Sequence, residues 1–492
     1  MPQSPQSLAA TTEDRATAGV NGSEGTSRLV VVSNRVPGLT ESSTAGRDRN
    51  EPVGGLVSAL KPAMEVQGGL WLGWSGKTTQ RRADTLLETF QLGSIRLATL
   101  DLSEDDVSLY YTGFANRTLW PLLHYFPERV DFRQETYRAY RRINRRFAIA
   151  VLSELSPGDT VWVHDFHLFH VGEELRNMGW KGKIGFFLHV PFPPADVLGI
   201  LPWARDILEA CLHYDLVGVH TQGYLRNLVD SLATLLGGTL SGQTYSWGQL
   251  SARLGAYPIG IDPTPFRPPI QQSGRGLTDR LSIPSSPAHK TILGVDRLDY
   301  TKGVPERLMA YERLLYRHRS LRGRVTLAQI SSPSRTRVPE YIAEKERVEE
   351  LVARINGRFS QDGWSPIRYL YRSYPREDLA RFYHDADVCI VTPLRDGMNL
   401  VAKEYVASQG DDPGVLVLSR FSGAASELRD ALIVNPYDID ATAAAIHEAL
   451  RMPPDERRRR WRGLMKAVEE NTSQSWAEGF LADLASSEPR PA

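Results

Sequence analysis

The stretch "VCIVTPLRDGMNLVAKEY", Val388–Tyr405, contains a strand, a turn and the start of a helix. Its first four residues are apolar, and Pro393 ends the run. The chain then turns through Arg395–Gly397 before a helix that we expect to begin at about Asn399. A wholly apolar strand that leads into a helix is typical of a parallel sheet covered by helices on both faces. The stretch therefore predicts an α/β fold.

The same alternation of apolar runs and amphipathic segments occurs in two sets along the chain. Before Pro263 the apolar runs are Leu29–Ser33, Thr160–His164, Ile184–Val190 and Leu216–His220. After it they are Thr291–Val295, Val325–Ile330, Ile367–Tyr371, Val388–Val391, Val415–Ser419 and Leu432–Val434. Two sets of Val/Ile/Leu-rich strands separated by helices predict two doubly wound, Rossmann-like domains that face each other across a cleft.

The length of 492 residues and one Pro-rich segment set the expected domain boundaries. The segment "GIDPTPFRPPIQQSGRG", Gly260–Gly276, is the expected linker. We predict a disordered N-terminal tail over residues 1–27, an N-terminal domain over 28–262 and a C-terminal domain over 263–470. A final helix and tail occupy 471–492, and this helix can pack back on the N-terminal domain.

Composition limits the classes of partner. Lysine and arginine together number 58, as do aspartate and glutamate, so the net charge is zero. A neutral chain has no global field to attract nucleic acid or an anionic membrane, and we expect neither as a partner. The two cysteines, Cys211 and Cys389, lie in apolar stretches, which excludes a disulfide framework and predicts a cytoplasmic location. The N-terminal tail lacks the features of a signal peptide, and no apolar run approaches the roughly 20 residues of a membrane helix.

Polar and charged residues follow the predicted strands at the point where each strand ends. Ligands of open α/β sheets bind outside these carboxyl ends, so we expect the side chains to line the cleft. They are Asn34 and Arg35, Asp165, His189, Arg297 and Lys302, Arg335, and Asp396.

The loop "DRLDYTKG" brings Arg297 and Lys302 close together. A guanidinium group and an ammonium group in one loop suit a diphosphate that gains charge as it leaves. The alternative is a solvated loop in which these two bases pair with Asp296 and Asp299. The loop by itself favours neither interpretation.

Three other patterns have simpler explanations than chemistry. In "VHDFHL", His164 and Asp165 point to opposite faces of a strand, so we predict no metal site. The stretch "DIDAT" resembles a phosphatase or metal-binding motif, but we expect Asp440 to cap the helix that follows. The basic run "DERRRRWRGL", Asp455–Leu464, is expected to be a solvated surface helix. The glycine motifs of NAD and ATP sites are missing from the sequence.

Eight blocks of sequence together resemble one known family. They are "VVVSNRVP", "GGLWLGWSG", "YYTGFANRTLWPLLHY", "VWVHDFHL", "IGFFLHVPFP", "YPIGID", "DRLDYTKGVPERL" and "TPLRDGMNLVAKEYVASQ". From about Arg28 to Leu484 the chain is similar to the trehalose-6-phosphate synthases, retaining glycosyltransferases of family 20 with the GT-B fold. The resemblance implies that glucose moves from UDP-glucose or GDP-glucose to glucose 6-phosphate, forming α,α-trehalose 6-phosphate. It implies no metal or cofactor, and we expect a homo-oligomer, a dimer or a tetramer.

The resemblance also implies roles for individual residues. The acceptor, in the N-terminal domain, would bind Arg35, Tyr111, Trp120 and Arg335 at its phosphate, Trp74 at its ring and Asp165 at its hydroxyl groups. The donor, mainly in the C-terminal domain, would bind Gly54, Gly55, His189, Arg297, Lys302, Asp396, the amides of Met398, Asn399 and Leu400, the neighbouring Val401, and Glu404 at the ribose. The implied catalytic set is Asp165, His189, Arg297, Lys302 and Asp396.

Two alternative functions and the identity of the donor base stay open. A related GT-B transferase could use a different sugar-phosphate or cyclitol-phosphate acceptor. A non-catalytic sugar-phosphate sensor would lack a donor-side residue, whereas Arg297, Lys302 and Asp396 are all present. The donor base is undetermined, because the small Ser373 in "LYRSYPRED" could admit a purine.

Overall fold

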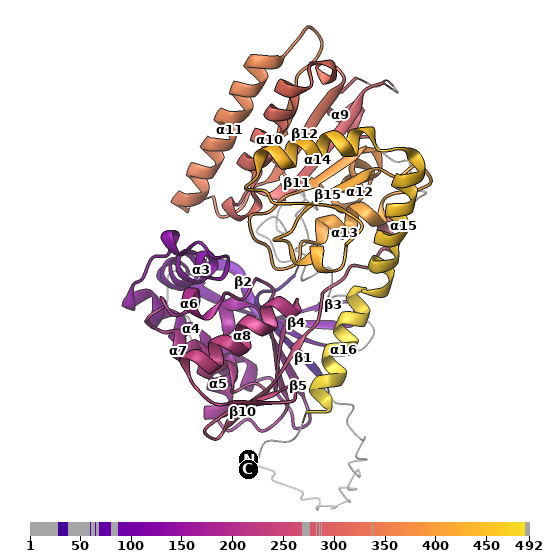
Figure 1. Cartoon of the computed structure of the whole chain (residues 1–492). Coiled ribbons are helices and arrows are strands. Elements are labelled where there is room, and N and C mark those ends of the chain that lie inside the picture. The colour runs from indigo at the N-terminus through magenta and orange to yellow at the C-terminus, as the bar shows by residue number, and fades with distance from the viewer. Residues whose placement is uncertain are drawn as a thin grey trace, which may run out of the picture.

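The computed structural model describes residues 28–37, 60, 64, 68–79, 87–267, 276–281, 283–284, 286, 288–336 and 338–487. These residues form two lobes, each built around a mostly parallel sheet (Figure 1). The predicted α/β class with two doubly wound sheets is confirmed. The exact domain boundaries stay a prediction.

The first sheet has the strand order β3-β4-β2-β1-β5-β6-β7-β10-β9-β8. Its strands are β1 (Leu29–Arg35), β2 (Gly69–Thr79), β3 (Glu88–Leu92), β4 (Ile95–Ser103), β5 (Thr160–His164), β6 (Ile184–Phe187), β7 (Leu216–Val219), β8 (Thr239–Ser241), β9 (Thr244–Trp247) and β10 (Leu250–Ala256). From β4 to β10 neighbouring strands are parallel, and β3, β9 and β8 add antiparallel edges. The strand order reverses between β1 and β5.

The second sheet is parallel throughout, in the order β13-β12-β11-β14-β15-β16. Its strands are β11 (Lys290–Arg297), β12 (Val325–Ser332), β13 (Ile367–Leu370), β14 (Val388–Val391), β15 (Val415–Ser419) and β16 (Leu432–Val434). Here the order reverses between β11 and β14. In open α/β sheets ligands bind at such reversal points, so each lobe offers one site at its carboxyl edge.

Helices cover the faces of both sheets. In the first lobe they are α2 (Glu104–Asp106), the π-helical segment Val107–Leu119, α3 (Trp120–Leu123), α4 (Gln134–Leu152), α5 (Val171–Asn177), α6 (Ala195–Leu198), α7 (Ala204–Cys211) and α8 (Gln222–Leu235). In the second they are α9 (Leu277–Leu281), α10 (Val304–Arg317), α11 (Pro339–Phe359), α12 (Arg376–Asp385), α13 (Leu400–Ala407), α14 (Ile439–Arg451) and α15 (Pro454–Glu470), and α16 (Ser473–Ala485) follows. No helix of the described ranges is long and apolar enough to cross a membrane.

Two local expectations have opposite outcomes. The predicted cap at Asp440 is wrong: the carboxylate of Asp438 accepts the Ala441 amide at 2.9 Å, and α14 begins one residue after Asp438. Asp440 is already the second residue of the helix and instead pairs with two arginines of α10. The basic run in α15 is a surface helix as predicted, since Arg458 pairs with Asp455 and Arg459 with Glu456.

The last helix, α16, returns to the first lobe and packs on its sheet, as the yellow helix in Figure 1 shows. The Phe480 ring stacks on Trp162 of β5, with centroids 4.6 Å apart and planes at 9°. Gly185 and Gly218 leave room for this ring, because a Cβ on either would lie under 3 Å from it. Phe480 is fully buried. The aromatic contact fastens the end of the chain to the sheet that carries the first site.

Replacing Phe480 with alanine is expected to destabilise the protein. The substitution removes a stacked, fully buried ring and leaves a cavity, which typically costs about 3–5 kcal/mol. Urea unfolding followed by tryptophan fluorescence measures the loss. Glu478→Ala, an exposed position on the same helix, is the control and should change stability by less than about 0.5 kcal/mol. Equal losses in the two variants would contradict the packing role.

Candidate active site

The two lobes meet at the carboxyl ends of their sheets. Gly397, after β14, lies so close to the end of β6 that a Cβ would overlap the carbonyl oxygen of His189. The hydroxyl of Tyr224 in α8 donates to the Asp396 carbonyl oxygen at 2.8 Å. The ammonium of Lys403 in α13 donates to the Ile259 carbonyl oxygen at 2.8 Å. These contacts bring the loop after β14 directly against the end of the first sheet.

The reversal point of the second sheet contains a buried ion pair. The ammonium of Lys302, 8% exposed, donates to Asp396 at 2.6 Å, and the Asn399 side chain donates to the same carboxylate at 2.9 Å. Burial raises the pKa of Asp396, but the charge and hydrogen bond of Lys302 outweigh it and lower the pKa below its usual value. Asp396 is therefore ionised at neutral pH and held in one orientation.

The solvated-loop interpretation of "DRLDYTKG" is not what the structure contains. Asp296 pairs with Arg307 of α10, and Asp299 pairs with Arg335 at 3.1 Å. Lys302 instead reaches across to Asp396. Arg297 is exposed and forms no ion pair with any carboxylate in the described part of the chain. The loop thus presents one fixed ammonium and one available guanidinium at the edge of the sheet.

Helix α13 begins beside this pair, with Asn399 at its N-cap in a left-handed conformation (φ 82°). The first amides of a helix lack intrahelical acceptors and favour an anion, so those of Asn399, Leu400 and Val401 form a local electropositive edge, and Met398 directly precedes them. Glu404 lies one turn further, where Tyr383 donates to it at 3.1 Å and burial raises its pKa. Asp396 and Glu404 therefore occupy different places, on either side of the helix start.

At the reversal point of the first sheet, aromatic rings form a row behind Arg35. The Arg35 guanidinium lies over Trp74, 4.6 Å from the ring centroid, and donates to the Gly76 carbonyl oxygen at 3.3 Å. Trp74 meets Tyr111 edge-on at 5.7 Å, and Tyr111 stacks on His167 at 5.9 Å. A cation beside stacked rings is a suitable surface for a phosphorylated sugar.

Asp165 and His189 lie at the ends of β5 and β6. Asp165 has a φ of 76°, unusual for a residue with a side chain, and its carboxylate accepts the His189 amide at 3.2 Å. Burial raises the pKa of Asp165 to about 6, against the opposing effect of two backbone amides and of Arg297 and Arg335. Burial also lowers the pKa of His189 well below its usual value, so its imidazole is neutral. Its Nε2 lies 3.1 Å from Nδ1 of His164.

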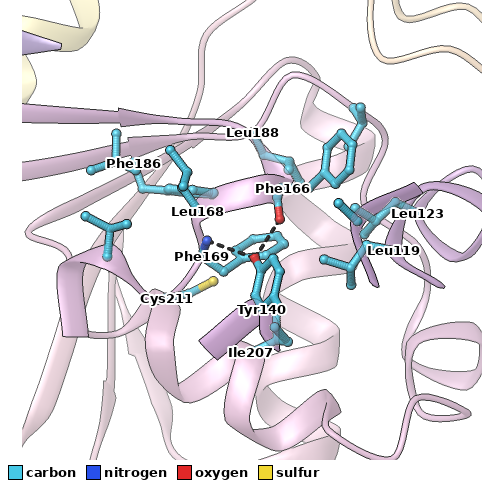
Figure 2. Close-up of a cluster of buried hydrophobic side chains, with 14 of the residues drawn as sticks. Leu119, Leu123, Tyr140, Phe166, Leu168, Phe169, Phe186, Leu188, Ile207 and Cys211 are labelled. Atoms are coloured by element: carbon cyan, nitrogen blue, oxygen red, sulfur yellow. Dashed lines mark hydrogen bonds between the residues drawn. The ribbon is translucent and has the colours of Figure 1, made fainter. Parts of the chain in front are cut away.

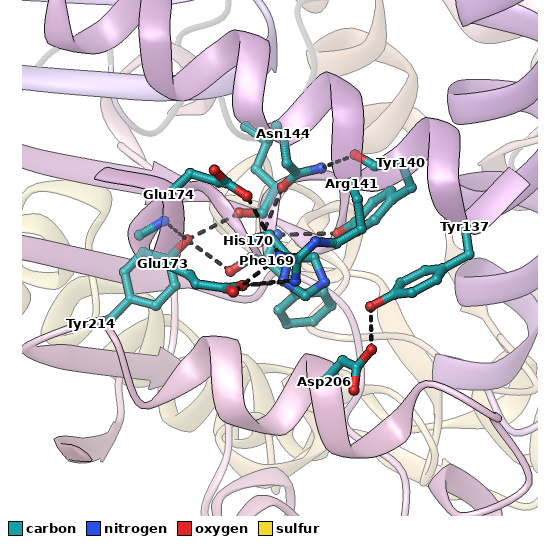
Figure 3. Close-up of polar contacts among 12 residues, drawn as sticks. Tyr137, Tyr140, Arg141, Asn144, Phe169, His170, Glu173, Glu174, Asp206 and Tyr214 are labelled. Carbon is teal, nitrogen blue, oxygen red and sulfur yellow. Dashed lines mark hydrogen bonds and ion pairs between the residues drawn. The ribbon is translucent and has the colours of Figure 1, made fainter. Parts of the chain in front are cut away.

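The turn after Asp165 is held by helix α4. The hydroxyl of Tyr140 donates to the Phe166 carbonyl oxygen at 2.7 Å and accepts the Phe169 amide at 3.1 Å, inside an apolar cluster (Figure 2). Next to it, Asn144 accepts the His170 amide at 3.0 Å (Figure 3). These buried bonds stabilise the turn on which the left-handed conformation of Asp165 depends.

Trp120 links the two sides of the site. The guanidinium of Arg335 lies 4.0 Å from its ring centroid and that of Arg297 lies 5.7 Å from it. Arg335 is fixed in place by Asp299 and by the hydroxyl of Tyr341. Arg335 comes from the second lobe and Trp120 from the first, so this contact also joins the lobes.

The structure thus brings the predicted residues of the described ranges to the two facing sheet edges. Gly54 and Gly55 lie outside the described residues. Two residues of the site are not among those predicted: His167, which stacks on Tyr111, and Asp299, which pairs with Arg335. His167 is part of "VHDFHL", where only a metal role was considered; no group of three or more potential metal ligands occurs among the residues that the structure covers.

Comparison with known proteins agrees with this arrangement. Residues 27–486 match the model of glycosyltransferase family 20. The chain is 44% identical over 471 residues to a trehalose-6-phosphate synthase of Sinorhizobium fredii, covering 94% of this chain and 99% of the relative. A relative of the same name from Mycolicibacterium smegmatis is 41% identical over 476 residues, covering 94% and 93%.

Two solved structures superpose closely. One is an α,α-trehalose-phosphate synthase (UDP-forming) from Burkholderia xenovorans in complex with glucose-6-phosphate, with TM-score 0.86, 40% identity, and 93% of this chain and 100% of that chain covered. The other, from E. coli, is bound with UDP-2-fluoro glucose, with TM-score 0.86, 40% identity, and coverage of 94% and 100%. The predicted GT-B arrangement and the family resemblance are confirmed, and the chain belongs to glycosyltransferase family 20.

Proposed function

We propose that this glycosyltransferase moves glucose from a nucleotide-diphosphate-glucose, UDP-glucose or GDP-glucose, to glucose 6-phosphate and forms α,α-trehalose 6-phosphate with retention. One observation carries the proposal: cationic groups lie at the carboxyl edges of both sheets, near the junction where Arg297 and Arg335 contact Trp120. Arg297 ends β11 and Lys302 lies in the loop that follows it, while Arg35 ends β1. A diphosphate donor and a phosphorylated acceptor need two such separate groups.

The donor would occupy the edge of the second sheet. Its diphosphate would lie between Arg297, Lys302 and the start of α13, and Gly54 and Gly55 would close over it. Asp396 and His189 would bind hydroxyl groups of the donor glucose, and Glu404 those of the ribose. The 2.6 Å contact between Lys302 and Asp396 supports this placement, since one ion pair then positions both the sugar and the phosphate partner.

The acceptor would occupy the edge of the first sheet. Its phosphate would bind Arg35 and Arg335, with Tyr111 and Trp120 beside them, and its ring would lie against Trp74. Asp165 would accept hydrogen bonds from sugar hydroxyls. Residues 28–262 would then be the acceptor-binding domain and 263–470 the donor-binding domain.

The chemistry would proceed on one face of the donor sugar. The bond between the anomeric carbon and the diphosphate oxygen breaks, and a bond to the anomeric oxygen of glucose 6-phosphate forms on the same side. The departing phosphate oxygen takes the proton of the acceptor. Arg297, Lys302 and the amides at the start of α13 would stabilise the charge that develops on the leaving group. Asp396, already bonded to Lys302 and Asn399, would orient the sugar rather than attack it.

The remaining expectations extend this proposal. Cys211 and Cys389 are free and buried, which supports a reducing compartment such as the cytoplasm. The protein would need no cofactor, and it would assemble as a homo-oligomer.

A donor panel tests the function. Purified protein with glucose 6-phosphate is expected to release the nucleoside diphosphate from UDP-glucose, GDP-glucose or both, and nuclear magnetic resonance should identify an α,α-linked product. The ratio of kcat/KM values assigns the base. An inositol phosphate, offered as acceptor, tests the alternative of a cyclitol-phosphate acceptor. A preference for it over glucose 6-phosphate, or no transfer from any nucleotide-glucose, would reject the proposal.

Metal removal should leave the rate unchanged. Arg297, Lys302 and the amides at the start of α13 would stabilise the negative charge on the leaving group, so a divalent ion is not required for that role. Activity is measured before and after EDTA treatment and dialysis, with a metal-dependent glycosyltransferase as the positive control. Inhibition that a divalent ion reverses would contradict the assignment.

Arg297→Ala is expected to slow turnover. Loss of a leaving-group cation should raise the barrier by at least about 2 kcal/mol, or roughly thirtyfold in kcat. Steady-state kinetics with saturating substrates measure the change. Arg462→Ala, at an exposed arginine of α15, removes the same charge far from the site and should leave kcat unaltered. A near-normal kcat for Arg297→Ala would exclude its role.

A further inference from the structure

A second cavity lies between the lobes, behind the loop that carries Asp396. Its volume is about 660 Å³, within the range of small-molecule sites. From the first lobe it is lined by the start of α8 and by the two residues before that helix, His220 and Thr221. From the second lobe it is lined by the segment after β15, from Arg420 to Arg429. Among the described lining residues none is itself assigned to the donor or acceptor, and only Arg395 is next to such a residue, Asp396, in the sequence.

Four arginines converge on this cavity without acidic neighbours. They are Arg226 of the first lobe and Arg395, Arg420 and Arg429 of the second, and among the described residues no aspartate or glutamate lines the space. Within the described ranges none of the four forms an ion pair; Arg395 lies over Tyr125 and Phe421, and Arg429 donates to the Ser426 carbonyl oxygen. Clustered like charges repel one another, so the arrangement favours an anion.

The contrast with the arginines of α15 is informative. On α15 the arginines Arg457, Arg458, Arg459 and Arg460 all have carboxylate partners. The four cavity arginines lie in a concave space contributed by both lobes, and among the described residues none of them pairs with a carboxylate. A solvated surface does not require this convergence, whereas a ligand with several negative groups does.

Two further features of the wall point to an anionic ligand. Helix α8 starts at the cavity, where Thr221 accepts the Tyr224 amide at 3.1 Å and the positive end of the helix faces the space. His220 is 2% exposed, and its Nδ1 has no hydrogen-bond partner in the described structure. The rings of Phe421 and Tyr224 add apolar surface for an organic group.

We propose that this cavity is a second ligand site that binds a small organic polyphosphate, either a bisphosphorylated sugar or a nucleoside polyphosphate. Four guanidinium groups match at least two phosphates, and a volume of about 660 Å³ suits a small molecule. The proposal does not depend on the function assigned to the first site.

A ligand in this cavity would affect the loop after β14, which carries Asp396. Ser422, in the cavity wall, donates to the Met398 carbonyl oxygen at 2.6 Å. Gly423 donates its amide to the Asp396 carbonyl oxygen at 3.2 Å, and Tyr224 donates its hydroxyl to the same oxygen. The wall of the cavity thus holds the backbone of the loop from behind. A ligand that orders this wall changes donor affinity, and the donor changes ligand affinity by the same factor.

Calorimetric titration of the full-length protein tests the site. The probes are fructose 1,6-bisphosphate, ATP and pyrophosphate, each added in the presence of saturating UDP and glucose 6-phosphate. Saturable binding of at least one probe is expected. Binding of the sugar bisphosphate alone, of ATP alone, or of all three identifies whether sugar, nucleotide or phosphate charge is recognised.

Matched double variants locate the binding. Arg420→Ala with Arg429→Ala should weaken binding at least about tenfold, because both side chains would contact phosphate. Arg138→Ala with Arg145→Ala removes the same charge from exposed positions on α4 and should leave binding unchanged. Replacing Arg420 and Arg429 with lysine should restore part of the affinity, which distinguishes lost contacts from misfolding. Absence of saturable binding for every probe, or equal weakening by the two alanine pairs, would overturn the proposal.

Discussion

The site depends on one steric constraint, the close contact of Gly397 with the end of β6. A side chain at Gly397 would collide with the His189 carbonyl, and one at Gly423 would collide with the Gly397 carbonyl in turn. Three backbone segments are therefore stacked without side chains between them. This stacking sets how near the second sheet comes to the first. It places Asp396 and the start of α13 at the carboxyl ends of β5 and β6, where Asp165 and His189 project.

Electrostatics then determine which cations are fixed and which are available. A chain of zero net charge that binds two anions must leave some cationic side chains without a carboxylate partner, while ion pairs hold other cationic side chains in position. Asp299 holds Arg335, and Asp396 holds Lys302, with each acid also contacting a second neighbour. Arg297 is left without such a partner in the described residues. The fixed cations give the site its geometry, and the available one can follow charge as it moves during a reaction.

Much of this architecture could be predicted from sequence, because buried parallel strands leave a strong signal. Each apolar run assigned before and after Pro263 contains a strand, although the strand in Ile184–Val190 stops at Phe187, and the residues that follow the strands lie at the facing edges as expected. Features that depend on tertiary contacts are harder to predict from the sequence. The stacking of His167 on Tyr111 requires a π-helical segment at Val107–Leu119 that apolar periodicity does not reveal. The sequence does not distinguish Asp438 from Asp440 as the N-cap of α14, because both are acids and only one residue lies between them.

The opening stretch of sequence posed a physical problem, since two acids lie next to a helix start suited to phosphate. The structure separates them by direction: Asp396 is neutralised by Lys302 before the helix, and Glu404 is buried against Tyr383 one turn later. The same loop has a second face, formed by its carbonyl oxygens, which Tyr224, Ser422 and Gly423 hold from the arginine-lined cavity. Hydrogen bonds hold the carbonyl side of this loop, and the Asp396 side chain and the helix amides lie on its other side. A movement of the loop on one side therefore also moves the groups on the other side. Whatever occupies either face therefore acts on the position of Asp396.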